Sequence, residues 1–168
     1  IIFEMFDNSD NHFEIVGSYR REKQDSGDID IIITKSKNDK SIFNELLDYL
    51  KQEKYIIEDG FLSRGDVKSL TIIDIYPEKE NTTKRRVDFL YAPPNEYVFA
   101  ILYFTGSKIF NTVMRQRAKD MGYTLNEHEF CYYNNGIKGK KVEKEFPDEK
   151  SIFDFLQIKF KRPNERID

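Results

Sequence analysis

Two aspartates interrupt an apolar stretch near the start of the chain. Asp28 and Asp30 lie in the segment SGDIDIII, in which all remaining residues from 29 to 33 are isoleucine. Alternate residues of a strand face the same side, so we expect the two carboxylates to lie next to each other. Like charges at that spacing are unfavourable without a cation between them, and Mg²⁺ prefers oxygen ligands of this kind. The pair predicts a magnesium site, although such a pair alone is more often a solvent-facing feature of an edge strand.

Residues just before this pair could hold phosphate groups. Gly17 and Ser18 end a predicted strand, and nine residues separate Ser18 from Asp28. A glycine-serine turn offers backbone N–H donors that suit phosphate oxygens. Arg21 adds a guanidinium that can donate two hydrogen bonds to one phosphate, and Gly27 permits close backbone approach.

A third carboxylate could complete the site. Asp88 lies in the apolar segment RRVDFLY. If this segment pairs with the strand that carries Asp30, three carboxylates converge on one patch. Three acids that hold two metal ions next to a phosphate-binding turn are suited to in-line phosphoryl transfer, in which one ion activates the attacking hydroxyl and the other stabilises the leaving group.

The composition excludes several other chemistries. Cys131 is the only cysteine among the 168 residues, which excludes an internal disulfide and a cysteine-based zinc cluster and suggests a reducing compartment. His12 and His128 are the only histidines, so a serine-histidine-aspartate mechanism has little support. No apolar run is long enough to span a membrane. The net charge of −3 does not indicate nucleic-acid binding, although the part after residue 101 is mildly basic.

The hydrophobic pattern predicts a mixed α+β chain. Ser41 and Ser107 are predicted N-caps, Gly65 is predicted in a tight turn, and Gly122 is predicted to end a helix. Period-two patterns predict strands at residues 12–19 (ending in the Gly17-Ser18 turn), within 55–76, and at 28–34, 85–91 and 123–133. Helical spacing predicts helices at residues 41–53, 96–104, 108–121 and 148–157.

Several of these segments together resemble one enzyme family. GSYRR, SGDIDIII, RRVDF, LYFTGSKIFN followed by MR, and YTLNEHEF occur in the order typical of the DNA polymerase X family, the polymerase beta-like group. The resemblance extends from about Phe13 to the C-terminus. It implies an α+β fold, with a nucleotidyltransferase palm that carries a mixed, mostly antiparallel sheet at residues 1–94 and a small α+β thumb at residues 95–168. The lyase and fingers domains of the family have no counterpart in the sequence, so we expect a palm-plus-thumb fragment or a minimal polymerase.

The resemblance implies a DNA-directed DNA polymerase that adds deoxynucleotides to a primer 3′-hydroxyl in short gaps, as in base excision or end-joining repair. Asp28, Asp30 and Asp88 are then the catalytic ligands of two Mg²⁺ ions, with Mn²⁺ able to replace them. The expected partners are gapped or primed duplex DNA and deoxynucleoside triphosphates, with no membrane, for a monomer. The expected location is intracellular: the nucleus, a viral factory or the cytoplasm.

The resemblance also assigns roles to further residues. Those implied to bind the nucleotide are Gly17, Ser18, Arg21, Ser26 and Gly27 at the phosphates, Tyr103, Phe104 and Gly106 at the sugar, and Asn111 at the base. Those implied to act on DNA are Arg64 and Lys68 at the primer backbone, Arg86 at the primer end, Arg115 at the template, and Glu127, which would pair with a thumb arginine to set open and closed states. Without the resemblance, each position has an ordinary explanation as a core aromatic, a surface pair or a turn charge.

The sequence also departs from the family pattern. Lys108 replaces an acid, Leu90 replaces an arginine and His128 replaces a tyrosine of beta-like members, which leaves base-pair checking and closure open. Family members that extend DNA without a template carry Gly-Trp at the positions of Tyr103 and Phe104, so we predict template-dependent addition. Two alternatives remain: a nucleotidyltransferase that modifies a small molecule, tRNA or protein, and an inactive DNA-binding or docking domain.

Overall fold

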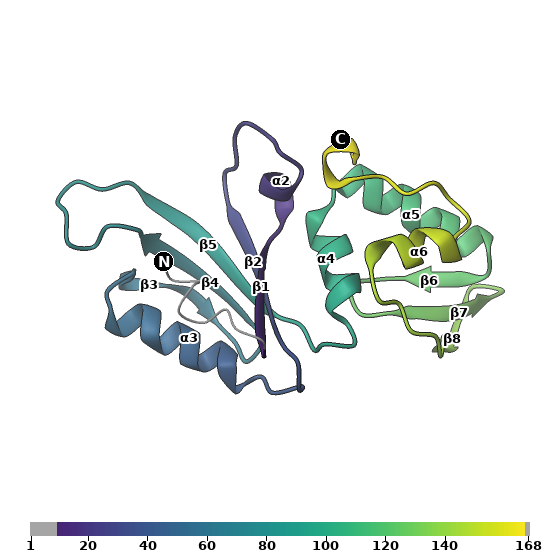
Figure 1. Cartoon of the computed structure of the whole chain (residues 1–168), viewed down its shortest axis with the longest axis horizontal. Helices are drawn as coiled ribbons and strands as arrows, with labels where there is room; N and C mark the ends of the chain where they lie inside the picture. The colour runs from purple at the N-terminus through teal and green to yellow at the C-terminus, as the bar shows by residue number, and fades with distance from the viewer. Residues whose placement is uncertain (1–9, 167–168) are drawn as a thin grey trace. The chain divides into compact units, whose positions relative to one another are not determined.

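The computed structural model describes residues 10–166, and the chain forms two compact units (Figure 1). The first contains residues 10–16 and 25–94, and the second contains residues 17–24 and 95–166. The predicted division at residue 94 differs in residues 17–24, which belong with the second unit. Residues 1–9 of the predicted first domain and residues 167–168 of the predicted second lie outside the described residues.

A five-stranded sheet forms the first unit. Its order is β1-β2-β5-β4-β3, in which β2 and β5 run parallel and all other neighbours run antiparallel. This confirms the predicted mixed, mostly antiparallel sheet. The strands are β1 (Asn11–Ile15), β2 (Ile29–Lys35), β3 (Ile56–Arg64), β4 (Lys68–Asp74) and β5 (Lys84–Tyr91).

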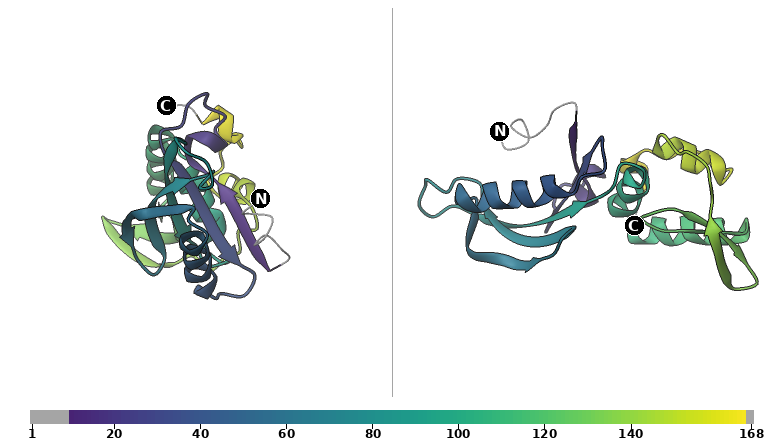
Figure 2. Two further views of the ribbon diagram at one scale, coloured as in Figure 1. Left: turned by 90° about the vertical axis from the view of Figure 1, so that its left-hand side faces the viewer. Right: turned by 90° about the horizontal axis from the view of Figure 1, so that it is seen from below.

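One helix covers one face of this sheet (Figure 2). Helix α3 (Ser41–Gln52) buries five apolar residues at helical spacing, including Phe43 and Leu46. They pack with Ile31, Ile33 and other buried residues of the sheet. Because side chains alternate along a strand, Asp30 and its same-side neighbours lie on the opposite face. Asp30 therefore points away from the core that α3 covers, and Ile32, its neighbour on that face, is buried as well.

The prediction that Ser41 caps α3 is wrong. Ser41 is the first helical residue, and the N-cap Lys40 makes no capping hydrogen bond with its side chain. Instead, the Asp39 carboxylate accepts a hydrogen bond from the Ser41 backbone N–H at 3.0 Å. Asp39 precedes the helix and serves the same purpose, because its oxygen satisfies a donor that the first turn leaves unpaired.

The second unit combines helices with a three-stranded antiparallel sheet, in the order β6-β7-β8. Its core is rich in phenylalanine, and Phe130 packs with the rings of Phe99, Phe146 and Phe155. The elements are α2 (Gly17–Arg20), α4 (Tyr97–Thr105), α5 (Lys108–Asp120), β6 (Tyr123–Leu125), β7 (Phe130–Asn134), β8 (Ile137–Lys141), α6 (Glu149–Phe155) and the 3₁₀ helix η1 (Pro163–Glu165).

Two local predictions for this unit need correction, and one strand was not predicted. The predicted strand at 123–133 is two strands, because the Asn126 side-chain oxygen accepts hydrogen bonds from the backbone N–H groups of His128 and Glu129 and makes a turn. The predicted turn at Gly17 is the one-turn helix α2. Strand β8 was not predicted, because all five of its residues are exposed and give no alternating pattern.

The two predicted serine caps give a direct stability test. The Ser107 side chain accepts a hydrogen bond from the Phe110 N–H at 3.2 Å, as predicted, whereas Ser41 caps nothing. We expect Ser107→Ala to lower the free energy of unfolding by about 1 kcal/mol, and Ser41→Ala to change it by less than about 0.5 kcal/mol. Urea unfolding of both variants checks this, and equal losses would contradict the assignment of the caps.

Candidate active site

Two of the three predicted acidic residues lie opposite each other in the first unit. Asp30 on β2 is the register partner of Asp88 on the parallel strand β5. Asp28 lies two residues before Asp30, just ahead of β2. Ile31 and Phe89, the next register pair of the two strands, are both buried in the core against α3, so Asp30 and Asp88 lie together on the opposite face. This pairing brings two distant parts of the sequence together and places their carboxylates on the face opposite α3.

Arg86 links the acids. Its Nε donates to Asp88 Oδ1 at 3.0 Å and its Nη2 donates to Asp88 Oδ2 at 3.1 Å, which makes a bidentate pair. Its Nη1 lies 4.0 Å from Asp28 Oδ2. Arg86 and Asp88 are two residues apart on β5 and therefore face the same side.

The cluster disfavours a negative charge on Asp30. Burial raises the pKa of Asp30, and the carboxylates of Asp88 and Asp28 raise it further, while Lys68 and Arg86 oppose the rise. Asp28 is 53% exposed and Asp88 is 15% exposed. A cation next to Asp30 would relieve this penalty, because opposite charge favours the ionised form.

The donor set fits a divalent ion chemically, since carboxylate oxygens are preferred ligands of Mg²⁺. Within residues 10–166, however, no three acidic, histidine or cysteine side chains gather closely enough to enclose a metal ion. Arg86 neutralises Asp88, which is the role that a bound cation would take over. Asp28, Asp30 and Asp88 are therefore candidate ligands.

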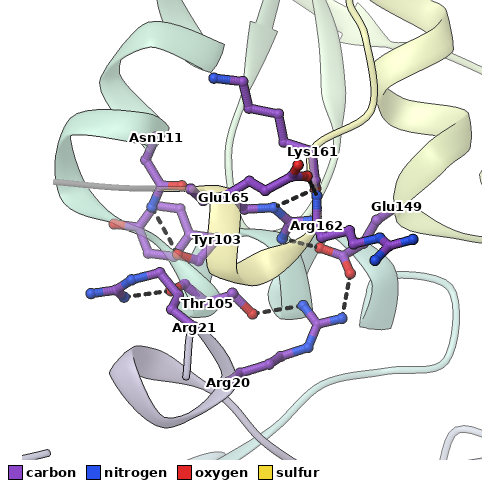
Figure 3. Close-up of polar contacts among 10 residues, drawn as sticks. Arg20, Arg21, Tyr103, Thr105, Asn111, Glu149, Lys161, Arg162 and Glu165 are labelled. Atoms are coloured by element: carbon purple, nitrogen blue, oxygen red, sulfur yellow. Dashed lines mark hydrogen bonds and ion pairs between the residues drawn. The ribbon is translucent and has the colours of Figure 1, made fainter. Parts of the chain in front are cut away.

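Among the predicted phosphate-binding residues before Asp28, Gly17 and Ser18 lie in α2 and Arg21 directly follows it, all within the second unit, whereas Ser26 and Gly27 belong to the first unit. Arg21 Nη1 donates to the Thr105 carbonyl oxygen at 2.7 Å (Figure 3). Its neighbour Arg20 donates to Thr105 Oγ1 at 2.8 Å and to Glu149 Oε1 at 2.5 Å. Neither Arg20 nor Glu149 was a predicted site residue, and the only signal for Arg20 was its place in GSYRR.

The other predicted phosphate- and sugar-binding residues near α2 differ in how closely neighbouring atoms surround them. Ser18 and Ser26 are half-buried, and a Cβ added at Gly27 would meet nothing within 4 Å. Gly106 follows α4 with φ of +70°, and its added Cβ would lie 3.2 Å from Arg21 Nη1. Gly106 therefore has both a backbone and a packing requirement for glycine.

A pair of glycine substitutions separates those two requirements. Gly136 also has a positive φ, of +78°, but open space around its Cα. We expect Gly136→Ala to lower the free energy of unfolding by about 1 kcal/mol, and Gly106→Ala to lower it by about 2 to 3 kcal/mol because Arg21 must also move. Chemical denaturation of both variants measures the difference in their free energies of unfolding. If Gly106→Ala is destabilised no more than Gly136→Ala, the Arg21 side chain moves away from the new Cβ without cost.

Three predicted nucleotide- and template-contacting residues line one hollow of the second unit. They are Tyr103 at the end of α4 and Asn111 and Arg115 on one side of α5. Asn111 Nδ2 donates to the Tyr103 carbonyl oxygen at 2.8 Å (Figure 3). The Phe104 ring packs against Tyr103 with centroids 5.0 Å apart.

The remaining predicted DNA contacts are Arg64 and Lys68 in the first unit and Glu127 in the second. Arg64 donates to Asp48 Oδ1 at 2.7 Å and its guanidinium lies over the Phe61 ring. Lys68 is the register partner of Leu90 and lowers the pKa of Asp30, so it belongs to the acidic face. Glu127 Oε1 lies 3.7 Å from His128 Nε2, and Lys108 is the first residue of α5.

Comparison with known proteins identifies the class. The DNA polymerase beta palm family matches residues 2–94, and the DNA polymerase beta thumb family matches residues 100–167. These matches cover most of the chain, which therefore belongs to the DNA polymerase beta family, the X family of nucleotidyltransferases. Palms of this family use divalent metal ions in general.

Relatives of this chain include two named DNA polymerase lambda. The one from Rattus norvegicus is 32% identical over 158 residues, which cover 89% of this chain and 28% of the relative. The one from Arabidopsis thaliana is 29% identical over 164 residues, covering 89% and 31%. A DNA nucleotidylexotransferase from Monodelphis domestica is 25% identical over 191 residues, covering 90% and 36%. The chain thus spans about a third of the length of these relatives. No helix within residues 10–166 is both long and apolar enough to cross a membrane.

Proposed function

We propose that this protein is a DNA-directed DNA polymerase that adds deoxynucleotides to a primer 3′-hydroxyl in short gaps during DNA repair. The observation that carries the proposal is the register pairing of Asp30 with Asp88, next to Asp28, in a chain of this family. The raised pKa of Asp30 supports it, because a carboxylate destabilised by its neighbours gains from a bound cation.

Each group of residues has a distinct task in this proposal. Asp28, Asp30 and Asp88 would hold two Mg²⁺ ions, or Mn²⁺ in their place. When bound, the ions would lower the pKa of the primer hydroxyl and neutralise negative charge on the phosphates. Ser18 and Arg21 donate hydrogen bonds to the triphosphate. Other proposed nucleotide contacts are Gly17, Ser26, Gly27, Tyr103, Phe104, Gly106 and Asn111, and other proposed DNA contacts are Arg64, Lys68, Arg86, Arg115 and Glu127.

The proposal extends to organisation and partners. Residues 1–94 act as the palm and residues 95–168 as the thumb. The substrates are gapped or primed duplex DNA and deoxynucleoside triphosphates, and the protein works as a monomer in the nucleus, a viral factory or the cytoplasm.

Incorporation of one labelled deoxynucleotide into single-nucleotide-gapped DNA with Mg²⁺ tests the proposal. We expect extension by the wild type, and a rate at least about 100-fold lower for Asp88→Ala, because the site loses a metal ligand. Glu45→Gln, which removes an exposed carboxylate on α3, serves as the matched control and should retain the wild-type rate.

The outcome also separates the alternatives. Loss of activity in the control as well would point to a general effect of charge. Nucleotide transfer without DNA would favour a nucleotidyltransferase that modifies another substrate. Sustained extension of single-stranded DNA would favour untemplated addition, and no transfer with any substrate would favour an inactive binding domain.

A further inference from the structure

One carboxylate joins two arginines from opposite ends of the chain. Glu149, the first residue of α6, accepts from Arg20 Nη2 through Oε1 at 2.5 Å (Figure 3). Its Oε2 accepts from Arg166 Nη1, also at 2.5 Å. The Glu149 side chain is 11% exposed and the Arg166 side chain is fully buried. Charge-assisted hydrogen bonds in such a setting are stronger and more directional than surface ion pairs.

Arg166 is a fixed anchor for this carboxylate. Its guanidinium carbon lies between 5.4 and 5.8 Å from the ring centroids of Phe110, Phe153 and Phe160. Its Nε and Nη2 both donate to the Lys161 carbonyl oxygen, at 3.1 and 3.0 Å. With the guanidinium held on several sides, the position of Glu149 is set by the packed interior of the second unit.

Helix α2, at the other end of this chain of contacts, is too short to hold itself in place. It has four residues, and the backbone hydrogen bond from Arg21 N–H to the Gly17 carbonyl is 3.4 Å long. A single helical turn is unfavourable without tertiary contacts, because nucleation costs more than one bond returns. Contacts that hold it include those of Arg20 with Glu149 and Thr105, that of Arg21 Nη1 with the Thr105 carbonyl oxygen at 2.7 Å, and that of Asn164 Nδ2, which donates to Glu22 Oε2 at 3.1 Å.

We infer that Glu149, anchored by Arg166, is a positioning residue that orients α2 through Arg20. The adjacent arginines then have separate tasks. Arg20 is held by Glu149, whereas Ser18 and Arg21, whose Nη1 donates to the Thr105 carbonyl oxygen, are the residues proposed for the nucleotide phosphates. The part of this inference that concerns phosphates rests on the proposed function. It follows that nucleotide binding depends on the segment from residue 161 to 166, although we assign none of these residues a contact with the substrate.

Glu149→Gln tests this inference with the full chain, and Lys150→Gln is its matched control. Glutamine keeps the shape of the side chain and removes the charge that both arginines share. Lys150 is the next residue of α6 and pairs only across the exposed helix surface, with Asp154 at 2.7 Å. Hydrogen exchange of the backbone amides of residues 17–24 reports the order of α2 directly, because local opening sets the exchange rate.

We expect Glu149→Gln to speed exchange in residues 17–24 about tenfold and to raise the nucleotide KM in gap filling about tenfold, with kcat changed less than about threefold. Lys150→Gln should change neither. A loss of stability without a change in α2 exchange or in KM would overturn the inference, because the contacts would then be structural only.

Arg20→Gln, alone and combined with Glu149→Gln, shows whether Glu149 acts through Arg20. We expect the double variant to raise KM no further than the single variants do, because residues in one network are not additive. Additive effects would overturn this route. If α2 exchange responds as expected but the wild type extends no DNA, the positioning of α2 stands and the proposed polymerase function fails.

Discussion

Asp30→Asn is expected to abolish nucleotide transfer and at the same time to stabilise the protein at neutral pH. The rate should fall by on the order of 1,000-fold, because a proposed ligand of both metal ions is lost. The melting temperature should rise by about 2 to 4 °C, because asparagine removes a charge that burial, Asp88 and Asp28 all disfavour. Asparagine has nearly the same shape, so packing is preserved.

The stabilisation should depend on pH in a defined direction. The pKa of Asp30 is raised in the folded protein. From the ordinary carboxyl pKa of about 3.9 up through the folded value, the folded state binds more protons than the unfolded state, so stability falls as pH rises. The advantage of Asp30→Asn should therefore be complete above the folded pKa and should vanish below about pH 4.

Thermal unfolding of the wild type and Asp30→Asn from pH 4 to pH 8, without divalent ions, measures this effect. Glu45→Gln, on the exposed surface of α3, is the control and should follow the wild type throughout. A lower melting temperature for Asp30→Asn at pH 7 would contradict the electrostatic account. Addition of Mg²⁺ should raise the melting temperature of the wild type more than that of Asp30→Asn, because only binding to the folded state stabilises it.

The second large expected effect is on stability. Arg166→Ala should lower the free energy of unfolding by about 3 to 5 kcal/mol, because it leaves the largely buried Glu149 with one arginine and opens space among three phenylalanine rings. The substitution also removes the two hydrogen bonds that the Arg166 guanidinium donates to the Lys161 carbonyl oxygen.

Two further variants show how far that loss of stability depends on the charge of Arg166 and on its burial. Arg166→Met fills the same space without charge and should recover part of the stability, because a buried ion pair can be replaced by apolar packing. Arg162→Ala, at an exposed neighbouring position, should change the free energy of unfolding by less than about 0.5 kcal/mol. Guanidinium unfolding of all three measures these values. Equal losses for Arg166→Ala and Arg162→Ala would show that burial of Arg166 contributes nothing.

Local patterns predicted much of the architecture. The isoleucines around Asp30 predicted the strand β2, because a short apolar run rich in β-branched residues is typical of a strand. The spacing of Ile42, Phe43 and Leu46 predicted α3 as a helix with one buried side. The errors lie where a hydrogen bond from the backbone to one polar side chain determines the local conformation, as at Asp39 and Asn126.

The sequence by itself determined which residues could do the chemistry: two aspartates on one side of a strand, a third in another apolar strand, and a glycine-serine turn before them. Only the tertiary structure decided that Asp88 is the register partner of Asp30, that Arg86 neutralises Asp88, and that Glu149 joins Arg20 to Arg166. Local periodicity fixes the type and face of an element. The pairing of distant segments depends instead on how all buried faces pack at once, which no short stretch of sequence encodes.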